Sequence, residues 1–349
     1  MASLIDITGL SLNTEEAKEI GKLIIEKGLI TGELSEDHTI ETGVLYKMQI
    51  PFAGRMADSL VKDAGCVPSL GTGIAMTEKI WEPEIYSTRW VHCAADLNKL
   101  FKLFQKAQRI NPDFYDRISS EEMGMIYALI DTMLQEVLPT KVWFSDKLAA
   151  IQPAGNFKTG TNLALFNVIN GLFKQIFADT AIPKVTIAEN SGANYAAQGL
   201  GTDSGYNALV ACYDGADSRL LSDPAAKFLV TRSVADNYRA TLRNKTLGNG
   251  YTDNTENGKP VLRFEGIEVK VRHDWDRNIK ALEDNGVKLN KPHRIVFTTP
   301  DNIPVATLSE SDLKELTSHY DMTLKSNITD VAFSLDAKFL ESYMASVAY

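Results

Sequence analysis

Apolar residues recur at helical spacing in several parts of the first half of the chain. A repeat behind a capping box predicts a helix over 13–28, which ends at a glycine. The same spacing predicts a second helix over 97–107. A stripe about five turns long, again opened by a capping box, predicts a third helix over 119–138 that ends before Pro139. Residues 141–146 predict a short strand that runs into a turn.

The chain between the first two predicted helices has a different pattern. Residues 43–51 and 79–90 read as extended, and their prolines exclude a central position in a sheet. Residues 52–78 contain four glycines and no sustained period. A segment this long without a core of its own is unusual inside a compact domain. It is therefore disordered, a lid, or an arm that contacts another subunit.

From residue 156 to residue 300 the pattern alternates between helix and strand. The predicted strands cover 184–188, 227–231, 262–273 and 294–299, and the predicted helices cover 163–177 (with a break at Gly171), 206–213 and a segment capped by Ser233. Alternation returns at 331–335 and predicts a strand in the tail. No internal repeat occurs. The mixture of helix and strand patterns predicts the α+β fold class.

Length and composition indicate the number of domains and the compartment in which the chain is made. The chain has 349 residues, of which 44% are apolar, as in a globular protein of about two domains or one elaborate domain. No apolar stretch is long enough to span a membrane, and the first residues do not have the pattern of a secretory signal. The three cysteines (Cys66, Cys93 and Cys212) are widely spaced, which argues against a disulfide framework and favours synthesis in a reducing cytosol.

The charge distribution excludes one class of function. The net charge is 36 − 45 = −9, and residues 1–40 and 301–349 each contribute 3 − 8 = −5. The middle of the chain is therefore close to neutral, at +1. Tight nucleic-acid binding depends on clustered Lys and Arg that displace counterions. Without such a basic stripe, a dedicated DNA-binding protein is not expected.

One glycine-rich segment has the spacing of a phosphate-binding loop. Gly155-Asn-Phe-Lys-Thr-Gly160 contains the two glycines, but Thr161 and Asn162 stand where the phosphate-binding lysine and its neighbour belong. We therefore interpret the segment as a turn in which Thr161 or Asn162 caps the next helix. The glycines at 71–73 and 199–205 also lack the spacing of a dinucleotide-binding fingerprint.

The other candidates for chemistry are weaker. His273-Asp-Trp-Asp276 places a histidine near two carboxylates, but adjacent side chains of a strand point to opposite faces. We therefore interpret it as the solvated end of a strand. The other histidines are scattered, and no Gly-x-Ser-x-Gly nucleophile motif occurs. We predict no enzyme activity, no cofactor, and no catalytic, cofactor-binding or metal-binding residue.

Three short runs and the order of the elements around them resemble a known family. The runs are Val142-Trp-Phe-Ser-Asp146 after the long helix, Phe264-x-Gly-Ile-x-Val269, and Thr298-Thr-Pro-Asp-Asn302. Over essentially the whole chain, this order and spacing is similar to the major capsid proteins of tailed bacteriophages, which have the Hong Kong 97-like fold.

The resemblance implies an α+β capsid fold divided into four parts. The parts are an N-terminal arm (1–45), an extended loop that lies across a neighbouring subunit (46–82), a peripheral domain with a long spine helix (83–155 and 301–349), and an axial domain (156–300). Some family members cross-link a lysine of the extended loop to an asparagine of a neighbour. Lys47, Lys62 and Lys79 have the required amine, but no motif selects one, so no cross-linking site is predicted.

The resemblance also implies a function and partners. The chain would self-assemble into hexamers and pentamers of an icosahedral shell around phage double-stranded DNA, which it would contact weakly and non-specifically. It would be made in the cytoplasm of the bacterial host and end in the virion, without contact with a membrane. Only about 40 residues precede the extended loop, too few for a fused scaffold of sustained heptads. We therefore expect a separate scaffolding protein, a portal and decoration proteins as partners, and an N-terminus retained through maturation.

Two other functions are compatible with parts of the sequence. An encapsulin-like compartment shell would share the fold but enclose enzyme cargo. A cytosolic enzyme with a nucleotide site near 155–162 would instead require Lys158 to contact the ligand.

Overall fold

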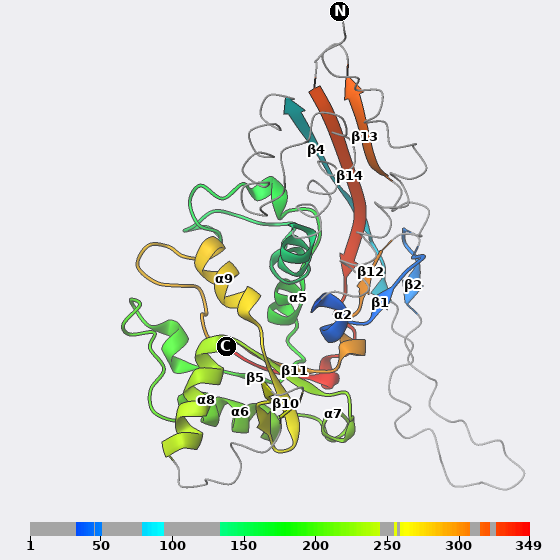
Figure 1. The fold of residues 1–349 in the computed structure, drawn as a ribbon. Helices are drawn as coiled ribbons and strands as arrows, with labels where there is room; N and C mark the ends of the chain where they lie inside the picture. The colour runs from blue at the N-terminus through cyan, green and yellow to red at the C-terminus, as the bar shows by residue number, and fades with distance from the viewer. Residues whose placement is uncertain are drawn as a thin grey trace, which may run out of the picture.

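A computed structural model of the chain describes residues 33–44, 46–50, 79–93, 133–244, 255–256, 259–307, 315–321 and 326–349. The predicted helices over 13–28 and 97–107, most of the helix over 119–138, and the segment 52–78 lie outside the described residues. Two large sheets organise the rest of the chain, and they are joined near the middle of the molecule (Figure 1).

The first sheet has six strands, in the order β5-β15-β11-β6-β10-β9. Their bounds are Lys184–Val185 (β5), Ala345–Ala348 (β15), Ile295–Thr298 (β11), Lys227–Val230 (β6), Ile267–Val271 (β10) and Arg263–Phe264 (β9). β6 and β10 are parallel, whereas β11 runs antiparallel to β6 and to β15. The predicted strands over 184–188, 227–231 and 294–299 are confirmed, and the second half of 262–273 forms β10.

Helices cover both faces of this sheet (Figure 1). One face packs against α6 (Ser204–Asp214), α7 (Ser218–Ser222) and α8 (Arg232–Asn244), and the other against α5 (Leu172–Ala178), α9 (His273–Leu282) and helical residues 133–144. The strands are apolar on both sides for this reason. Phe228 and Val230 belong to the first core, between the sheet and α6, α7 and α8, whereas Leu229 belongs to the second core, between the sheet and α5, α9 and residues 133–144.

An aromatic cluster lies at the centre of the second core. The rings of Trp143 and Trp275 are 4.6 Å apart between centroids, and Phe173 lies 5.0 Å from Trp143 and 4.9 Å from Trp275. Both tryptophans are fully buried. These rings join the helix at 133–144, α5 and α9 beneath the six-stranded sheet.

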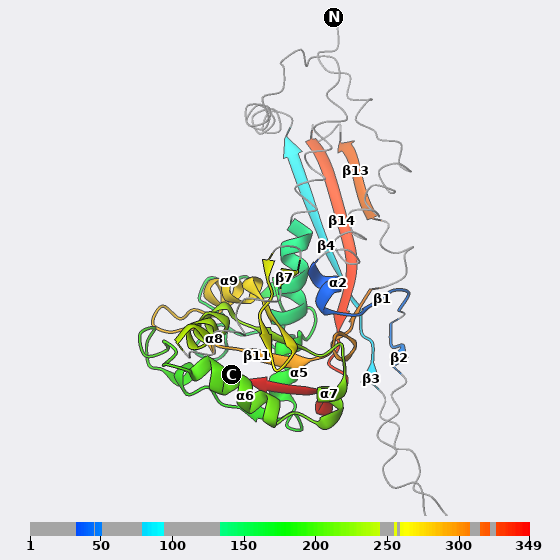
Figure 2. The same cartoon turned by 60° about the horizontal axis from the view of Figure 1, so that its bottom comes forward.

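The second sheet is a long ribbon that extends away from the first (Figure 2). Its central strand is β14 (Ser326–Ala337), flanked by β4 (Glu84–Cys93) and by β13 (Glu315–Asp321). β12 (Val305–Ala306) pairs with the end of β14, and β1 (Ile40–Glu41) adds a parallel strand beside β12. The prediction of a strand in the tail is confirmed by β14. Among the described strands β4 pairs with β14 alone, which is the edge position that the proline before it predicted.

The remaining elements are short. They are α2 (Glu33–Asp37), the hairpins β2–β3 (Gln49–Ile50 and Lys79–Ile80) and β7–β8 (Thr255–Glu256 and Lys259–Pro260), and the 3-10 turns η2 (Leu163–Leu165), η3 (Ala188–Ser191), η4 (Pro300–Asn302) and η5 (Ser342–Met344).

The helix predicted over 163–177 is wrong in its first half, where only the 3-10 turn Leu163–Leu165 forms, and α5 begins after Gly171. Two further sequence predictions about local structure were wrong. Residues 141–144 continue a helix through Pro139, where a strand was predicted after the proline. A proline inside a helix costs about 3 kcal/mol. The extra turn fully buries Val142 and Trp143, and each buried side chain contributes about 2–3 kcal/mol. Tertiary packing therefore outweighs the local signal.

The second error concerns His273. It begins helix α9 and does not end a strand. Asp274 and Asp276 lie in the first turn of this helix, where carboxylates are favoured by the helix dipole. The alternation of the preceding strand concealed the start of the helix, since the apolar face that follows is short and consists of Trp275, Ile279 and the partly buried Leu282.

Candidate functional site

The glycine-rich segment 155–160 is a turn. The side chain of Asn162 accepts a hydrogen bond from the backbone N–H of Ala164 at 3.1 Å and caps η2, as the sequence predicted. The Lys158 backbone N–H donates to the carbonyl of Leu282 at 2.6 Å, which holds the turn against the end of α9. The segment therefore has a structural role that accounts for its glycines.

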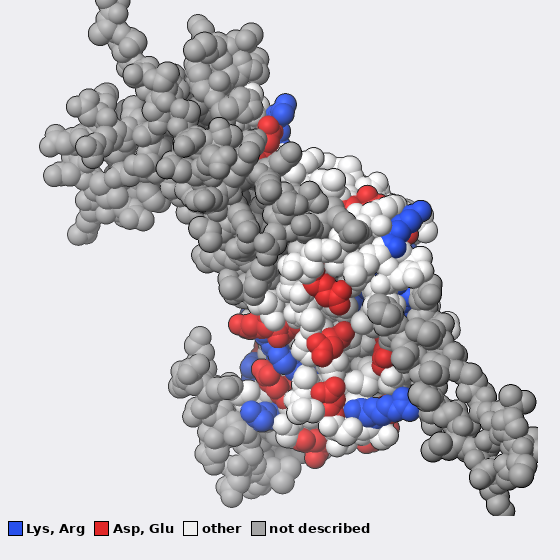
Figure 3. Space-filling view, turned by 90° about the vertical axis from the view of Figure 1, so that its right-hand side faces the viewer, with Lys and Arg blue, Asp and Glu red and all other residues white. Residues whose placement is uncertain are grey.

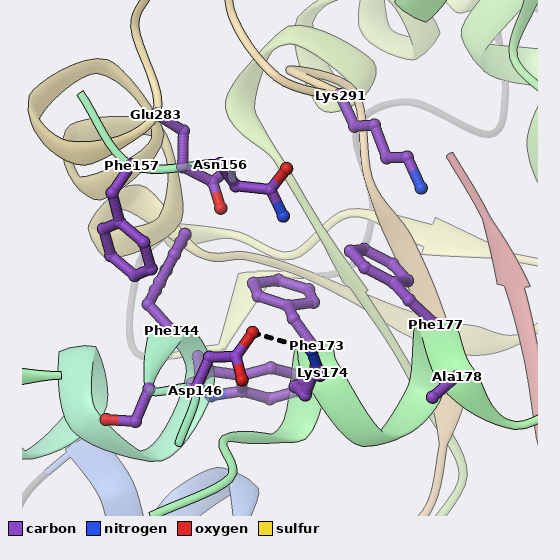
Figure 4. Close-up of a pocket in the computed structure, with 12 residues that line it drawn as sticks. Phe144, Asp146, Asn156, Phe157, Phe173, Lys174, Phe177, Ala178, Glu283 and Lys291 are labelled. Carbon is purple, nitrogen blue, oxygen red and sulfur yellow. Dashed lines mark hydrogen bonds and ion pairs between the residues drawn. The ribbon is translucent and has the colours of Figure 1, made fainter. Parts of the chain in front are cut away.

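A pocket of about 290 Å³ opens beside this turn (Figure 4). Phe144, Phe157, Phe173 and Phe177 contribute much of its wall. Most of its charges have partners: Lys174 donates to Asp146 at 2.8 Å, and buried Arg294 donates to Glu283 at the rim. Its lining combines aromatic rings with ion pairs and places no nucleophile beside a base.

Lys291 also lines this pocket and has an unusual environment. Its amine lies 3.8 Å from the ring centroid of Tyr349 and 4.4 Å from that of Phe177. Burial, reinforced by the charge of Arg294, lowers the pKa of Lys291 to about 8. Aromatic faces stabilise a cation without requiring a carboxylate.

Ser233 and His293 approach each other as a nucleophile and a base do. Ser233 Oγ lies 2.7 Å from His293 Nδ1, and His293 Nε2 lies 2.6 Å from the carbonyl oxygen of Gln198. Because that carbonyl only accepts, Nε2 carries the proton and Nδ1 accepts from the serine hydroxyl. Neither residue lines the pocket, so we interpret the pair as a lock between α8, β11 and the loop at Gln198.

Among the described residues, no three His, Cys, Asp or Glu side chains are grouped so that they could hold a metal ion. Within that same set, no helix has the length and apolar character needed to span a bilayer. Cys212 is buried as a free thiol, and burial raises its pKa to about 12. A thiol in this state is inert.

Large apolar side chains are exposed on the segments that flank residues 51–78. On 46–50 and 79–80 they are Tyr46, Met48 and Ile80. On the outer face of β4 they are Ile85 and Val91, with 67% and 54% of their surface exposed. Exposed apolar groups concentrated in one region are typical of surfaces that bind another protein. No described strand pairs with the outer edge of β4.

The charged surface differs from that of a nucleic-acid-binding protein. On the face in Figure 3, acidic and basic side chains are interspersed, and no broad basic patch covers the described residues. This agrees with the net charge of −9.

Comparisons with known proteins identify the fold. No family model and no curated protein matches the sequence. The capsid of cyanophage P-SCSP1u matches in structure with a TM-score of 0.52 and 16% identity, over 91% of this chain and 88% of that chain. A chain of the satellite phage P4 procapsid matches with a TM-score of 0.51 and 10% identity, over 94% and 98% of the two chains.

A third match comes from a compartment shell. The holo-SrpI encapsulin complex of Synechococcus elongatus matches with a TM-score of 0.50 and 10% identity, over 88% of this chain and 84% of that chain. The fold is thus that of shell-forming capsid proteins, and the α+β Hong Kong 97-like class inferred from the sequence is confirmed. At sequence identities of 10–16%, the structural similarity establishes the fold alone.

Sequence reasoning missed several residues that organise this structure. Trp275 was treated as part of a strand end, yet it completes the aromatic cluster beneath the six-stranded sheet. Arg272 lies in the predicted strand over 262–273 and was not singled out, yet its side chain is 3% exposed and binds Asp37, a residue 235 positions earlier. No local signal could have found this pair, because its partners are distant in sequence.

Proposed function

We propose that this chain is the major capsid subunit of a tailed bacteriophage, which self-assembles into hexamers and pentamers of an icosahedral shell around double-stranded DNA. The observation that carries the proposal is the fold, shared with phage capsid chains over 91–94% of this chain. Exposed Ile85 and Val91 support it, because a monomer gains nothing from apolar side chains in water.

We propose the division into four parts that the resemblance implies, with one change. Residues 1–45 are the arm, 46–82 the extended loop, 83–155 with 301–349 the peripheral domain, and 156–300 the axial domain. One boundary needs adjustment: β15 pairs with β11 over Ala345–Ala348, inside the six-stranded sheet. We therefore assign these last residues to the axial domain.

The surface charge supports a weak contact with the packaged DNA. A shell that holds DNA by enclosure does not require the phosphate contacts that tight binding requires. We propose a separate scaffolding protein and a portal as assembly partners, synthesis in the cytoplasm of the bacterial host, and the virion as the final location.

Native mass spectrometry and negative-stain electron microscopy of the purified full chain test the proposal. We expect hexamers, pentamers or closed shells built from the 38.5 kDa subunit. A protein that stays monomeric at micromolar concentration, alone and when co-expressed with the neighbouring structural genes, would contradict it.

An encapsulin-like shell is the second candidate, favoured by the match to an encapsulin over 88% of this chain. The contents of purified particles separate the two functions. A particle that carries DNA has a high ratio of absorbance at 260 nm to that at 280 nm, whereas one that carries protein has the ratio of protein alone. A protein-filled particle would support the compartment shell and exclude DNA packaging.

A further inference from the structure

Helix α2, with His38 directly after it, lies where the two sheets of the molecule meet (Figures 1 and 2). Leu34 is 1% exposed and belongs to the core beneath the six-stranded sheet. Beyond His38, the Thr39 N–H donates to the carbonyl of Pro300 at 3.2 Å, and β1 then pairs with β12. Residues 33–38 thus contact the core beneath the six-stranded sheet and lead directly into a strand of the second sheet.

A cluster of buried charges holds this segment. The side chain of Asp37 is fully buried; it accepts from Arg272 Nη1 and lies 2.9 Å from Lys270 Nζ. Arg272 also binds Asp274 through two hydrogen bonds, at 2.8 and 2.7 Å. Lys270 donates to Glu36 at 2.5 Å. A buried pair of this kind is costly to break, since one partner is left as an uncompensated charge.

His38 sits inside this cluster as a neutral ring. Its Nδ1–H donates to the carbonyl of Ile303 at 2.8 Å, and its ring centroid lies 5.4 Å from that of Trp143. Its Nε2 is buried and has no hydrogen-bond partner among the described residues. A proton added at Nε2 would create a buried donor without an acceptor, next to the guanidinium of Arg272. The buried environment of His38 therefore stabilises the neutral imidazole relative to the imidazolium.

We propose that residues 33–38 form an acid-released latch, in which neutral His38 keeps the segment seated between the two sheets and protonation of its ring opens it. This inference does not rest on the proposed function, because every contact lies within one chain. The groups that face His38 are Asp37 on its own segment, Arg272 and Asp274 from the β10–α9 junction, and Trp143.

The direction of the pH dependence follows from these neighbours. Burial and then the charge of Arg272 lower the pKa of His38 to about 4, against 6.5 in the open chain. The carboxylates of Asp37 and Asp274 act in the opposite sense but are already engaged by Arg272. Between pH 6.5 and 4 the open segment binds more protons, so acid favours opening. From these values, the opening equilibrium constant at pH 5 is about 30-fold larger than at pH 8.

Asp37 does not contribute to the pH dependence of opening between pH 5 and pH 8. Although burial alone would raise its pKa, Arg272 and Lys270 hold the pKa of Asp37 below its usual value of 3.8. It is therefore ionised in both the closed and the open state between pH 5 and pH 8. The latch in this interval depends on His38 alone.

Hydrogen exchange of the unassembled full chain, read by mass spectrometry, tests the latch. Protection factors, which correct for the intrinsic effect of pH, are compared at pH 8 and pH 5 for peptides that cover 33–38. We expect a loss of about 30-fold in the wild type. Peptides from β6 and β11 serve as an internal reference and keep their protection.

Two variants distinguish the effect of protonating His38 from a general sensitivity of the protein to acid. In His38→Asn the side chain cannot titrate, so we expect protection that changes less than threefold between the two pH values. In His273→Asn, the control, an exposed histidine next to the cluster is removed, and the response should match the wild type. Unchanged protection in the wild type, or an equal loss in His38→Asn, would overturn the proposal. An NMR titration of the His38 ring in the wild type gives a second measurement that needs no variant: a midpoint between 4 and 6.5 supports the latch, and one at 6.5 refutes it.

Discussion

At the scale of single residues, close approaches between backbones decide which side chains are allowed. Gly171 precedes α5 with a φ of −67°, which any residue adopts, so its backbone conformation does not require glycine. Its surroundings do: a Cβ there would lie 2.8 Å from the nitrogen of Ser145 and 2.9 Å from the carbonyl oxygen of Trp143. The sequence predicted a helix interrupted at this glycine; in the structure the helix begins after it, and the requirement for glycine is steric.

Replacing Gly171 with alanine should therefore destabilise the protein. The added methyl group meets backbone atoms that cannot rotate away, and overpacking of this kind costs about 1–3 kcal/mol. Urea unfolding of the unassembled chain, followed by tryptophan fluorescence, measures the loss. Gly199→Ala is the matched control, because its nearest atom would be 3.3 Å away, and we expect a change below about 1 kcal/mol. Equal stability of Gly171→Ala and the wild type would show that the backbone at residues 143–145 moves to accommodate the methyl group.

At the scale of elements, β4 has two unequal faces. Tyr86 and Trp90 pack against the core, with the ring of Tyr86 stacked 5.5 Å from that of Phe333. Ile85 and Val91 point the other way and are exposed. A strand with apolar side chains on both faces is typical of one that is covered on both sides. Among the described residues, β4 packs against the core on one side only.

The outer face of β4 should matter for assembly and not for folding. In Ile85→Ser with Val91→Ser, we expect the free energy of unfolding of the single chain to change by less than about 0.5 kcal/mol. Assembly should require several-fold more protein, as measured by light scattering across a concentration series. Leu148→Ser is the control, since Leu148 is 79% exposed on a turn outside this surface and should assemble normally. Normal assembly of the double variant would exclude this face from the contact between subunits.

At the scale of the whole molecule, the hairpin β2–β3 shows where the proposed extended loop would join the body. Ile50 pairs with Lys79, so the chain leaves and re-enters the described part of the molecule at one point. Lys79 also donates from its amine to the carbonyls of Phe339 and Leu340, at 2.5 and 2.7 Å. The junction is therefore held by contacts that do not involve the intervening residues.

We expect that residues 51–78 can be removed without disturbing the body, because Ile50 and Lys79 pair directly. A variant in which Asn-Gly replaces them closes the hairpin with a tight turn. We expect a folded, soluble protein with the same tryptophan fluorescence as the wild type, which no longer forms shells. A control in which the same residues are replaced by a Gly/Ser linker of equal length tests whether their sequence matters beyond their length. Normal particles from the Asn-Gly variant would refute the role of this segment in assembly.

The sequence by itself determined the α+β class, the positions of most strands, and the resemblance to capsid proteins. These signals are local: strand periods, caps such as Asn162, and short runs in a fixed order. Only the tertiary structure decided that the helix at 133–144 passes through Pro139, that α9 begins at His273, and that β15 completes the six-stranded sheet. It also brought Asp37 and His38 to Arg272 and buried Trp275 beside Trp143. Each of these outcomes depends on burial against residues far away in the chain, and the free energy of that burial exceeds the local preferences that the sequence pattern reports.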